Sequence, residues 1–259
     1  MLVFLIRYPG SWLDLADRDA ERRISNSIST LEYQATDAFV ALNLFLPELS
    51  APDREARRRT RDREAAERSR VEADLRAELG EARYYADHTA VSEEVERRAK
   101  NDRWARGETP HSYTARCKFI YAHAFLYAVD GFGKVLATLA KDPAGAARLS
   151  ESSERHRAAF PGTTDVRDSA QHIEDRGRGY DRKGKPLDLK PIVNSVINAP
   201  NGGVLILGSL FRDQLTYTAS SGSQASISIS VDSAKQIQAR FQEVLDAFPW
   251  KGPARLLPD

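Results

Sequence analysis

Arg167 and His172 are the two residues whose types and spacing most readily suggest chemistry in this sequence. A neutral imidazole can accept a proton from one oxygen near pH 7 and return it to another. A guanidinium stays charged and can hold a phosphate through two N–H groups while negative charge builds on it. The pair would suit phosphoryl chemistry that needs neither a metal nor another cofactor.

The segment around this pair is predicted to be one helix over 163–177, because Val166, Ala170 and Ile173 recur at helical spacing. Five residues at about 100° each place Arg167 and His172 about 140° apart around such a helix. Both side chains could therefore contribute to one site only if the site surrounds the helix on two sides.

Two other interpretations of the same helix remain open. Asp168, His172 and Asp175 follow one another at i, i+4 and i+7. Such a stripe is most often a solvated face stabilised by i,i+4 pairs. The same stripe could also hold a metal ion, although we predict none.

Arg167, the polar Asp168 and then His172 after four intervening residues resemble the R-x4-H motif of HEPN domains. HEPN domains are helical bundles, and many are metal-independent ribonucleases. The resemblance implies a homodimer in which each copy supplies an arginine, here Arg167, a polar follower, here Asp168, and a histidine, here His172. Attack by the 2′-hydroxyl would restrict the substrate to RNA, and the family suggests a toxin or defence effector with an antitoxin or other protein partner.

Three further Arg–His pairs have compatible spacing but a different context: Arg83 to His88, Arg106 to His111 and Arg116 to His123. Gly107 and Pro110 interrupt the second pair, which excludes one helix there. The third pair falls on the most apolar segment, where we expect a buried, hydrogen-bonded histidine.

A basic stretch over 176–185 follows the candidate helix directly. Its cations and its aromatic residue could contact phosphates and stack one base; they are Arg176, Arg178, Tyr180, Arg182, Lys183 and Lys185. An exposed loop between domains is the plainer interpretation of this stretch.

Composition excludes several functional classes. The chain has 259 residues and a formal net charge of +1, so no global field favours nucleic acid or an acidic membrane. Cys117 is the single cysteine, which excludes an internal disulfide and suits a reducing, cytoplasmic compartment. The apolar run 2–6 is too short to span a bilayer, and no Walker A, GxSxG, HExxH or CxxC motif is present.

The elements that must position the candidate pair are mostly helical. Helical periodicity covers 19–46, 84–104, 112–141 and 144–159, while 53–79 is dense in charge. That charged helix either projects into solvent or frays, with a phosphate-tracking arm as the alternative; over 54–70 it has eight arginines against four acids. After Gly177 the period changes to that of short strands, followed by a helix containing Ile237, Phe241 and Phe248.

We therefore expect a mainly α protein: a HEPN-like helical bundle over 1–178, and a small antiparallel β-meander with a closing helix, α+β in character, over 179–259. The function expected is RNA cleavage. The alternatives are a non-catalytic helical scaffold or binding module, and an RNA-binding protein that does not cleave.

Overall fold

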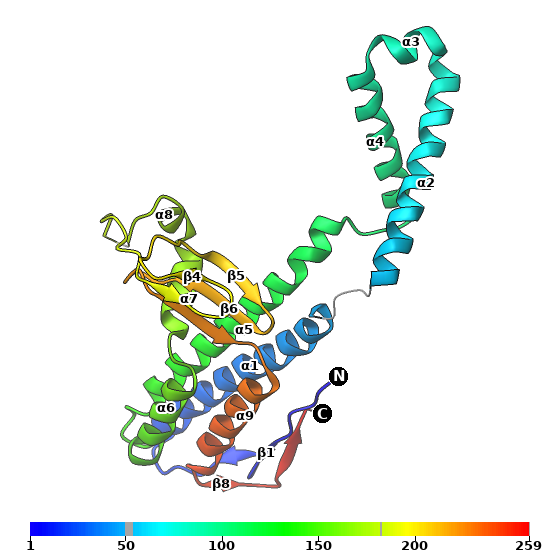
Figure 1. The fold of residues 1–259 in the computed structure, drawn as a ribbon. Helices are drawn as coiled ribbons and strands as arrows, with labels where there is room; N and C mark the ends of the chain where they lie inside the picture. Colours follow the sequence, from blue (N-terminus) through cyan, green and yellow to red (C-terminus); the bar gives the residue numbers. More distant parts are fainter. Residues whose placement is uncertain (50–53, 182, 259) are drawn as a thin grey trace. The chain divides into compact units, whose positions relative to one another are not determined.

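A computed structural model describes residues 1–49, 54–181 and 183–258, which form two compact units (Figure 1). One unit comprises Met1–Leu49 and Lys118–Asp259, and the other comprises Ser50–Cys117. The described residues are mainly helical with small antiparallel sheets, which confirms the predicted fold class.

The helices and strands follow one another along the chain as the periodicity predicts in outline. The helices are α1 (Arg18–Glu48), α2 (Arg54–Leu79), α3 (Glu81–Ala86), α4 (His88–Ala105), α5 (His111–Leu139), α6 (Ala146–Ala159), α7 (Thr163–Gln171), α8 (Ile173–Gly177) and α9 (Val231–Asp246). The strands are β1 (Ile6–Tyr8), β2 (Trp12–Leu13), β3 (Ile192–Val193), β4 (Asn198–Ala199), β5 (Leu207–Phe211), β6 (Gln214–Thr218), β7 (Gln224–Ser228), β8 (Trp250–Lys251) and β9 (Arg255–Leu257).

Helices α1, α5 and α9 supply most of the core of the larger unit. Helix α1 starts where the Asp17 carboxylate accepts the N–H groups of Asp19 and Ala20. Ile24, Leu31 and Leu42 of its apolar stripe are fully buried, and Phe39 and Leu46 of the same stripe are partly buried against the core. Helix α5 is the most apolar helix, yet within the described ranges no helix combines the length and apolarity that a bilayer crossing requires.

The sheet β5-β6-β7 is an antiparallel meander, as expected for the C-terminal part. Its central strand β6 is buried along most of its length. Helix α7 packs against all three strands, and Tyr217 of β6 reaches His123 of α5, with 2.7 Å between the hydroxyl oxygen and Nε2. The meander therefore lies against the helix that carries the candidate residues.

Short strands at the two ends of the chain pair with each other. Strand β1 pairs with β9, with Ile6 opposite Leu257, and β2 pairs with β8. The sequence predicted neither pairing.

The chain is not divided into compact units at the predicted boundary between residues 178 and 179. Residues on both sides of that boundary share one core, for example Ile24 and Phe125 with Leu215 and Phe241. The change of hydrophobic period marks a change of secondary structure, and it does not separate two cores. The second compact unit instead lies within the predicted bundle segment.

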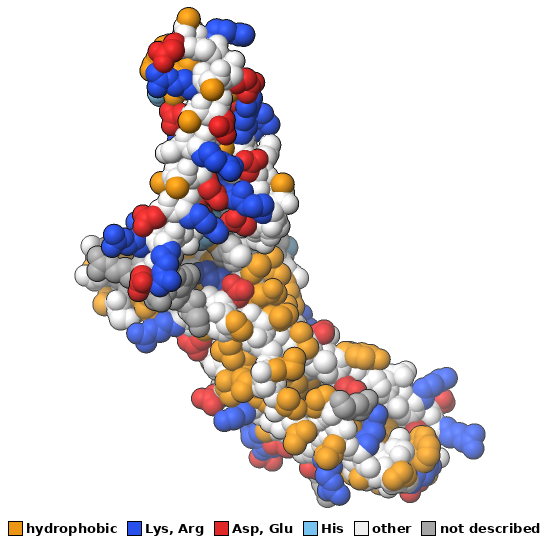
Figure 2. Space-filling view, turned by 90° about the vertical axis from the view of Figure 1, so that its right-hand side faces the viewer, with side chains coloured by type: hydrophobic (Ala, Val, Ile, Leu, Met, Phe, Trp, Pro, Cys, Tyr) orange, Lys and Arg blue, Asp and Glu red, His pale blue; other side chains and the backbone are white. Residues whose placement is uncertain are grey.

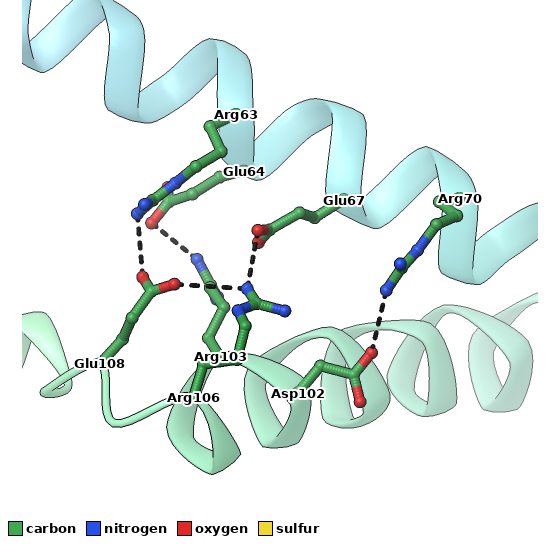
Figure 3. Close-up of polar contacts among 8 residues, drawn as sticks. All are labelled: Arg63, Glu64, Glu67, Arg70, Asp102, Arg103, Arg106 and Glu108. Atoms are coloured by element: carbon green, nitrogen blue, oxygen red, sulfur yellow. Dashed lines mark hydrogen bonds and ion pairs between the residues drawn. The ribbon is translucent and has the colours of Figure 1, made fainter.

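The unit Ser50–Cys117 contains a helical hairpin with a small apolar cluster and several ion pairs between its helices. Its apolar cluster is small, with Val71, Leu75, Val91, Val95 and Ala99 at its centre. Oppositely charged side chains of the middle of α2 and of the C-terminal end of α4 with the residues after it face one another across the hairpin (Figure 3). The pairs are Arg63–Glu108, Glu64–Arg103, Glu67–Arg106 and Arg70–Asp102, at 2.6 to 3.3 Å.

These pairs refine the prediction for the charged segment 53–79, of which residue 53 lies outside the described residues. The segment is helical from Arg54. Several of its arginines are paired with acids rather than left to track phosphates: Arg70 with Asp102 of α4 and Arg63 with Glu108 beyond α4. Arg58 and Arg59 pair with acids of α2 itself, and Arg76 pairs with Glu81 of α3. This arrangement disfavours a phosphate-binding arm.

Candidate functional site

Helix α7 is positioned by a tight turn and by its apolar face. Gly162 precedes it with φ +79°, a left-handed conformation that favours glycine. Val166 and Ser169 are fully buried against the sheet side of the core. The opposite side of α7 presents Arg167 and Asp168.

The helix predicted over 163–177 is interrupted at His172. Helix α7 ends at Gln171, and His172 adopts φ −111° and ψ 42°, after which α8 begins. The prediction of one continuous helix was wrong at this residue, although the His172 N–H still donates to the Asp168 carbonyl at 3.0 Å. The two candidate side chains therefore do not follow ideal helical angles.

Arg167 is held by carboxylates on two helices. Its Nε lies 3.2 Å from Oδ2 of Asp130 on α5, and its Nη1 lies 2.5 Å from Oδ1 of Asp168. Nη1 also donates to Gln171 Oε1 at 3.1 Å. The side chain is 18% exposed, and no hydrogen bond of Nη2 is found within the described ranges. The guanidinium is therefore fixed in place by its Nε and Nη1 contacts.

His172 is the more accessible of the two residues. Its side chain is 44% exposed, and its Nδ1 lies 3.7 Å from Oε1 of Glu174. No hydrogen bond or ion pair joins His172 to Arg167 within the part of the chain that the structure describes.

His172, Glu174 and Asp175 also bring one ligand atom each to within 4.8 Å of one another. Nitrogen and oxygen donors of this kind suit zinc and related divalent ions. The group differs from the predicted Asp168, His172, Asp175 stripe, since Asp168 lies against Arg167 instead. Asp175 is already paired with Arg178 at 2.7 Å.

Arg176 does not lie where the sequence predicted. It is 1% exposed, and its Nη1 donates to the Tyr180 carbonyl oxygen at 2.8 Å, while Nε and Nη2 are buried without hydrogen bonds. A side chain buried in this way cannot contact RNA in this conformation. The prediction that Arg176 binds phosphate is therefore corrected.

The rest of the basic stretch is a surface loop. Arg178, Lys183 and Lys185 are exposed, and the Arg178 guanidinium lies 5.9 Å from the Tyr180 ring centre. The Asp181 carboxylate accepts the backbone N–H groups of Lys185 and Lys183, and these bonds lower its pKa.

Arg182, the remaining predicted contact of this loop, lies outside the described residues. The loop thus keeps three of its predicted cations on the surface, on the chain segment that follows His172.

The other Arg–His pairs have a different structural context from the candidate pair. Arg83 and His88 fall on different helices, α3 and α4, and Arg106 follows the end of α4 whereas His111 begins α5. His123 is hydrogen-bonded to Tyr217, as expected, but it is partly buried rather than fully buried.

Sequence reasoning missed two buried titratable residues, Asp130, which pairs with Arg167, and His156. Asp130 is 9% exposed and lies in the most apolar helix, where a lone acid is a signal of an internal partner. His156, on α6, is 6% exposed, and burial lowers its pKa to about 4. It is a neutral core histidine at pH 7.

The chain was compared with protein-family models, with curated proteins and with solved structures, and none matches. The candidate site therefore has to be judged on its own geometry.

Proposed function

We propose that this protein is a HEPN-type endoribonuclease that cleaves RNA through the 2′-hydroxyl without a metal. His172 would act as the general acid and base, and Arg167 would hold the scissile phosphate through Nη2. Asp168 would orient Arg167, as its contact at 2.5 Å suggests. The exposed cations of 178–185 would contact the RNA backbone.

The observation that carries the proposal is that an accessible His172 follows an anchored arginine by five residues in the chain. The imidazole is 44% exposed, and a carboxylate lies near Nδ1. Arg167, five residues earlier, is preorganised by three side chains, so little conformational entropy is lost when it binds phosphate. By the HEPN analogy a second copy would bring a second pair into one site.

The test is cleavage of a labelled RNA by the purified full chain in EDTA. We expect products ending in 2′,3′-cyclic phosphate, which attack by the adjacent hydroxyl produces. His172→Gln should lower the rate by at least about 100-fold. Arg167→Lys keeps the positive charge and should also lower the rate, because a lysine cannot reproduce the anchored fork.

His88→Gln is the matched control for the histidine, since His88 is exposed at the start of α4. It should leave cleavage unchanged. If the wild-type chain does not cleave RNA, or if His172→Gln cleaves at the wild-type rate, the proposal is wrong. Cleavage that requires a divalent ion would instead favour chemistry on His172, Glu174 and Asp175.

A second candidate function is a non-catalytic binding module. The observation that favours it is that Arg167 faces two carboxylates, Asp130 and Asp168, which offset its charge. An arginine so paired is typical of a structural bridge between helices. RNA affinity that falls steeply with salt, without cleavage, would support RNA binding through 178–185.

A further inference from the structure

Helix α1 carries an exposed apolar stripe opposite its buried one. Tyr33, Val40 and Leu44 are 47% to 68% exposed, and together with Asp37 they are spaced by four, three and four residues. This alternation is the spacing of a coiled-coil seam, whose side chains pack into another helix. The stripe has no helix against it within the described residues of its unit, since its side chains remain exposed.

Helix α5 continues the apolar surface beside this stripe. The two helices run in opposite directions (Figure 1), and the side chain of Gln34 on α1 lies against Gly131 on α5. Leu44 follows Gln34 by ten residues on α1, and Ile120 precedes Gly131 by eleven residues on α5. Because the helices are antiparallel, the two side chains lie at about the same height along the pair. Ile120 and Tyr127 are exposed as well, so one surface extends over both helices.

The N-terminal segment extends the surface on the other side of α1. Leu2 is tied to α1, because its N–H donates to Asn43 Oδ1, and Phe4 stacks on Phe39. Val3 and Leu5 alternate with the buried Phe4 and Ile6 and point outward. On the face that Figure 2 draws, hydrophobic side chains lie next to one another.

We call this surface the α1/α5 face. Its members are Leu2, Val3, Leu5, Tyr33, Asp37, Val40, Leu44, Ile120 and Tyr127. Eight large side chains, each roughly half exposed, present an area on the order of 700 Å², more than the largest apolar patch on most monomers. A typical stable interface covers about 800 Å² on each partner.

The chemistry of the face selects its occupant. Asp37 is its one charged member, so it offers no cations for RNA phosphates or for an anionic membrane. A helix with a matching apolar stripe would fill it best. A second copy of this chain supplies such a helix in α1 itself, and a twofold axis would bring equal areas together.

We propose that the chain forms a homodimer through the α1/α5 face, with α1 of each copy packed against α1 of the other. This inference does not depend on RNA cleavage, because it rests on exposed apolar area alone. It assigns a surface to dimerisation that is built from the N-terminal segment, α1 and α5.

The experiment is light scattering coupled to size exclusion on the full chain, over about 1 to 100 µM. The wild-type mass should rise from 28.9 kDa toward twice that value with concentration. Val40→Lys and Leu44→Lys should each raise the dissociation constant by at least about tenfold, because a charge would be buried in the interface. Circular dichroism would show that both variants fold.

Val193→Lys is the matched control. Val193 is 69% exposed on β3, outside the face, so its substitution should leave the dimer unchanged. A wild-type chain that stays monomeric at 100 µM, or a dimer that Val40→Lys and Leu44→Lys do not weaken, would overturn the proposal. So would a monomer whose binding to uncharged lipid vesicles depends on Val40, since the occupant would then be a lipid surface.

Discussion

Asp130 Oδ2 lies 3.2 Å from Arg167 Nε and 2.6 Å from Lys134 Nζ, in the middle of the most apolar helix of the chain. Asp130 is 9% exposed, and the Arg167 Nε is buried without a directed hydrogen bond. The carboxylate is therefore the main electrostatic partner of the buried end of the Arg167 guanidinium. This bridge joins α7 to α5 and fixes the candidate arginine.

Asp130→Ala should destabilise the larger unit by about 3 kcal/mol, because it removes one of the two carboxylates that offset a largely buried guanidinium and the one that faces its buried Nε. Urea denaturation followed by circular dichroism measures the change. Asp188→Ala is the control, since Asp188 and Lys190 form an exposed ion pair whose loss should cost less than about 0.5 kcal/mol. Equal losses in the free energy of unfolding for the two substitutions would show that the Asp130–Arg167 pair stabilises the chain no more than an exposed ion pair does.

His156 should make the stability depend on pH. Burial lowers its pKa in the folded chain to about 4, whereas in the unfolded chain it stays near 6.5. The unfolded state therefore binds a proton first as the pH falls. Stability should be complete above pH 6.5 and should decline by about 3 kcal/mol as the pH drops toward 4.

His156→Leu tests this origin, because it removes the titrating group and keeps an apolar side chain against Phe132 and Phe160. Urea midpoints at pH 7.5, 6.0 and 5.0 should then change much less than in the wild type. His88→Leu, at an exposed position, should retain the wild-type decline. A His156→Leu chain that loses stability as steeply as the wild type would contradict the prediction.

The hairpin α2–α4 should depend on its ion pairs more than the larger unit does. Arg103→Glu would place two acids together, because Arg103 Nη1 lies 2.6 Å from Glu64 Oε1. Hydrogen exchange of the α2 and α4 amides should become about two- to fivefold faster. The added substitution Glu64→Arg should restore slow exchange by reversing the pair.

Arg61→Glu is the control for that experiment, since it changes the net charge equally. Arg61 is exposed on α2 and has no ion pair or hydrogen bond within the described ranges. Exchange that responds equally to Arg61→Glu and Arg103→Glu would assign the effect to net charge rather than to the pair.

The helices could be predicted because their apolar spacing is local. The predicted segment 19–46 became Arg18–Glu48, and 112–141 became His111–Leu139. The meander was likewise predicted from short alternating runs and turn residues. Local patterns of this kind decide secondary structure wherever one face is buried.

The parts that sequence missed depend on distant partners. Strands β1 and β2 have two or three residues each and pair with segments about 240 residues away, a separation that local patterns do not reveal. The burial of Arg176 contradicts the usual exposure of arginine. The ion pairs of the hairpin also join residues 32 to 45 positions apart, beyond any i,i+4 rule.

Substitution by alanine should have different effects on stability at Gly131 and at Gly133 of α5. Alanine in a helix interior is normally more stable than glycine by about 1 kcal/mol. At Gly133 the new Cβ would lie 2.7 Å from Nε2 of His156, a buried ring that Phe132 and Phe160 hold in place. Gly133→Ala should therefore destabilise the chain by about 1 to 3 kcal/mol.

At Gly131 the new Cβ would meet only the flexible end of Gln34, which is not fully buried and can turn aside, so Gly131→Ala should be neutral or stabilising. Thermal denaturation of the two variants gives the comparison. The double variant Gly133→Ala/His156→Ala should cost less than the two single substitutions together, because removing the imidazole removes the clash. Strict additivity, or a Gly133→Ala chain as stable as Gly131→Ala, would mean that the His156 ring does not confine this part of α5.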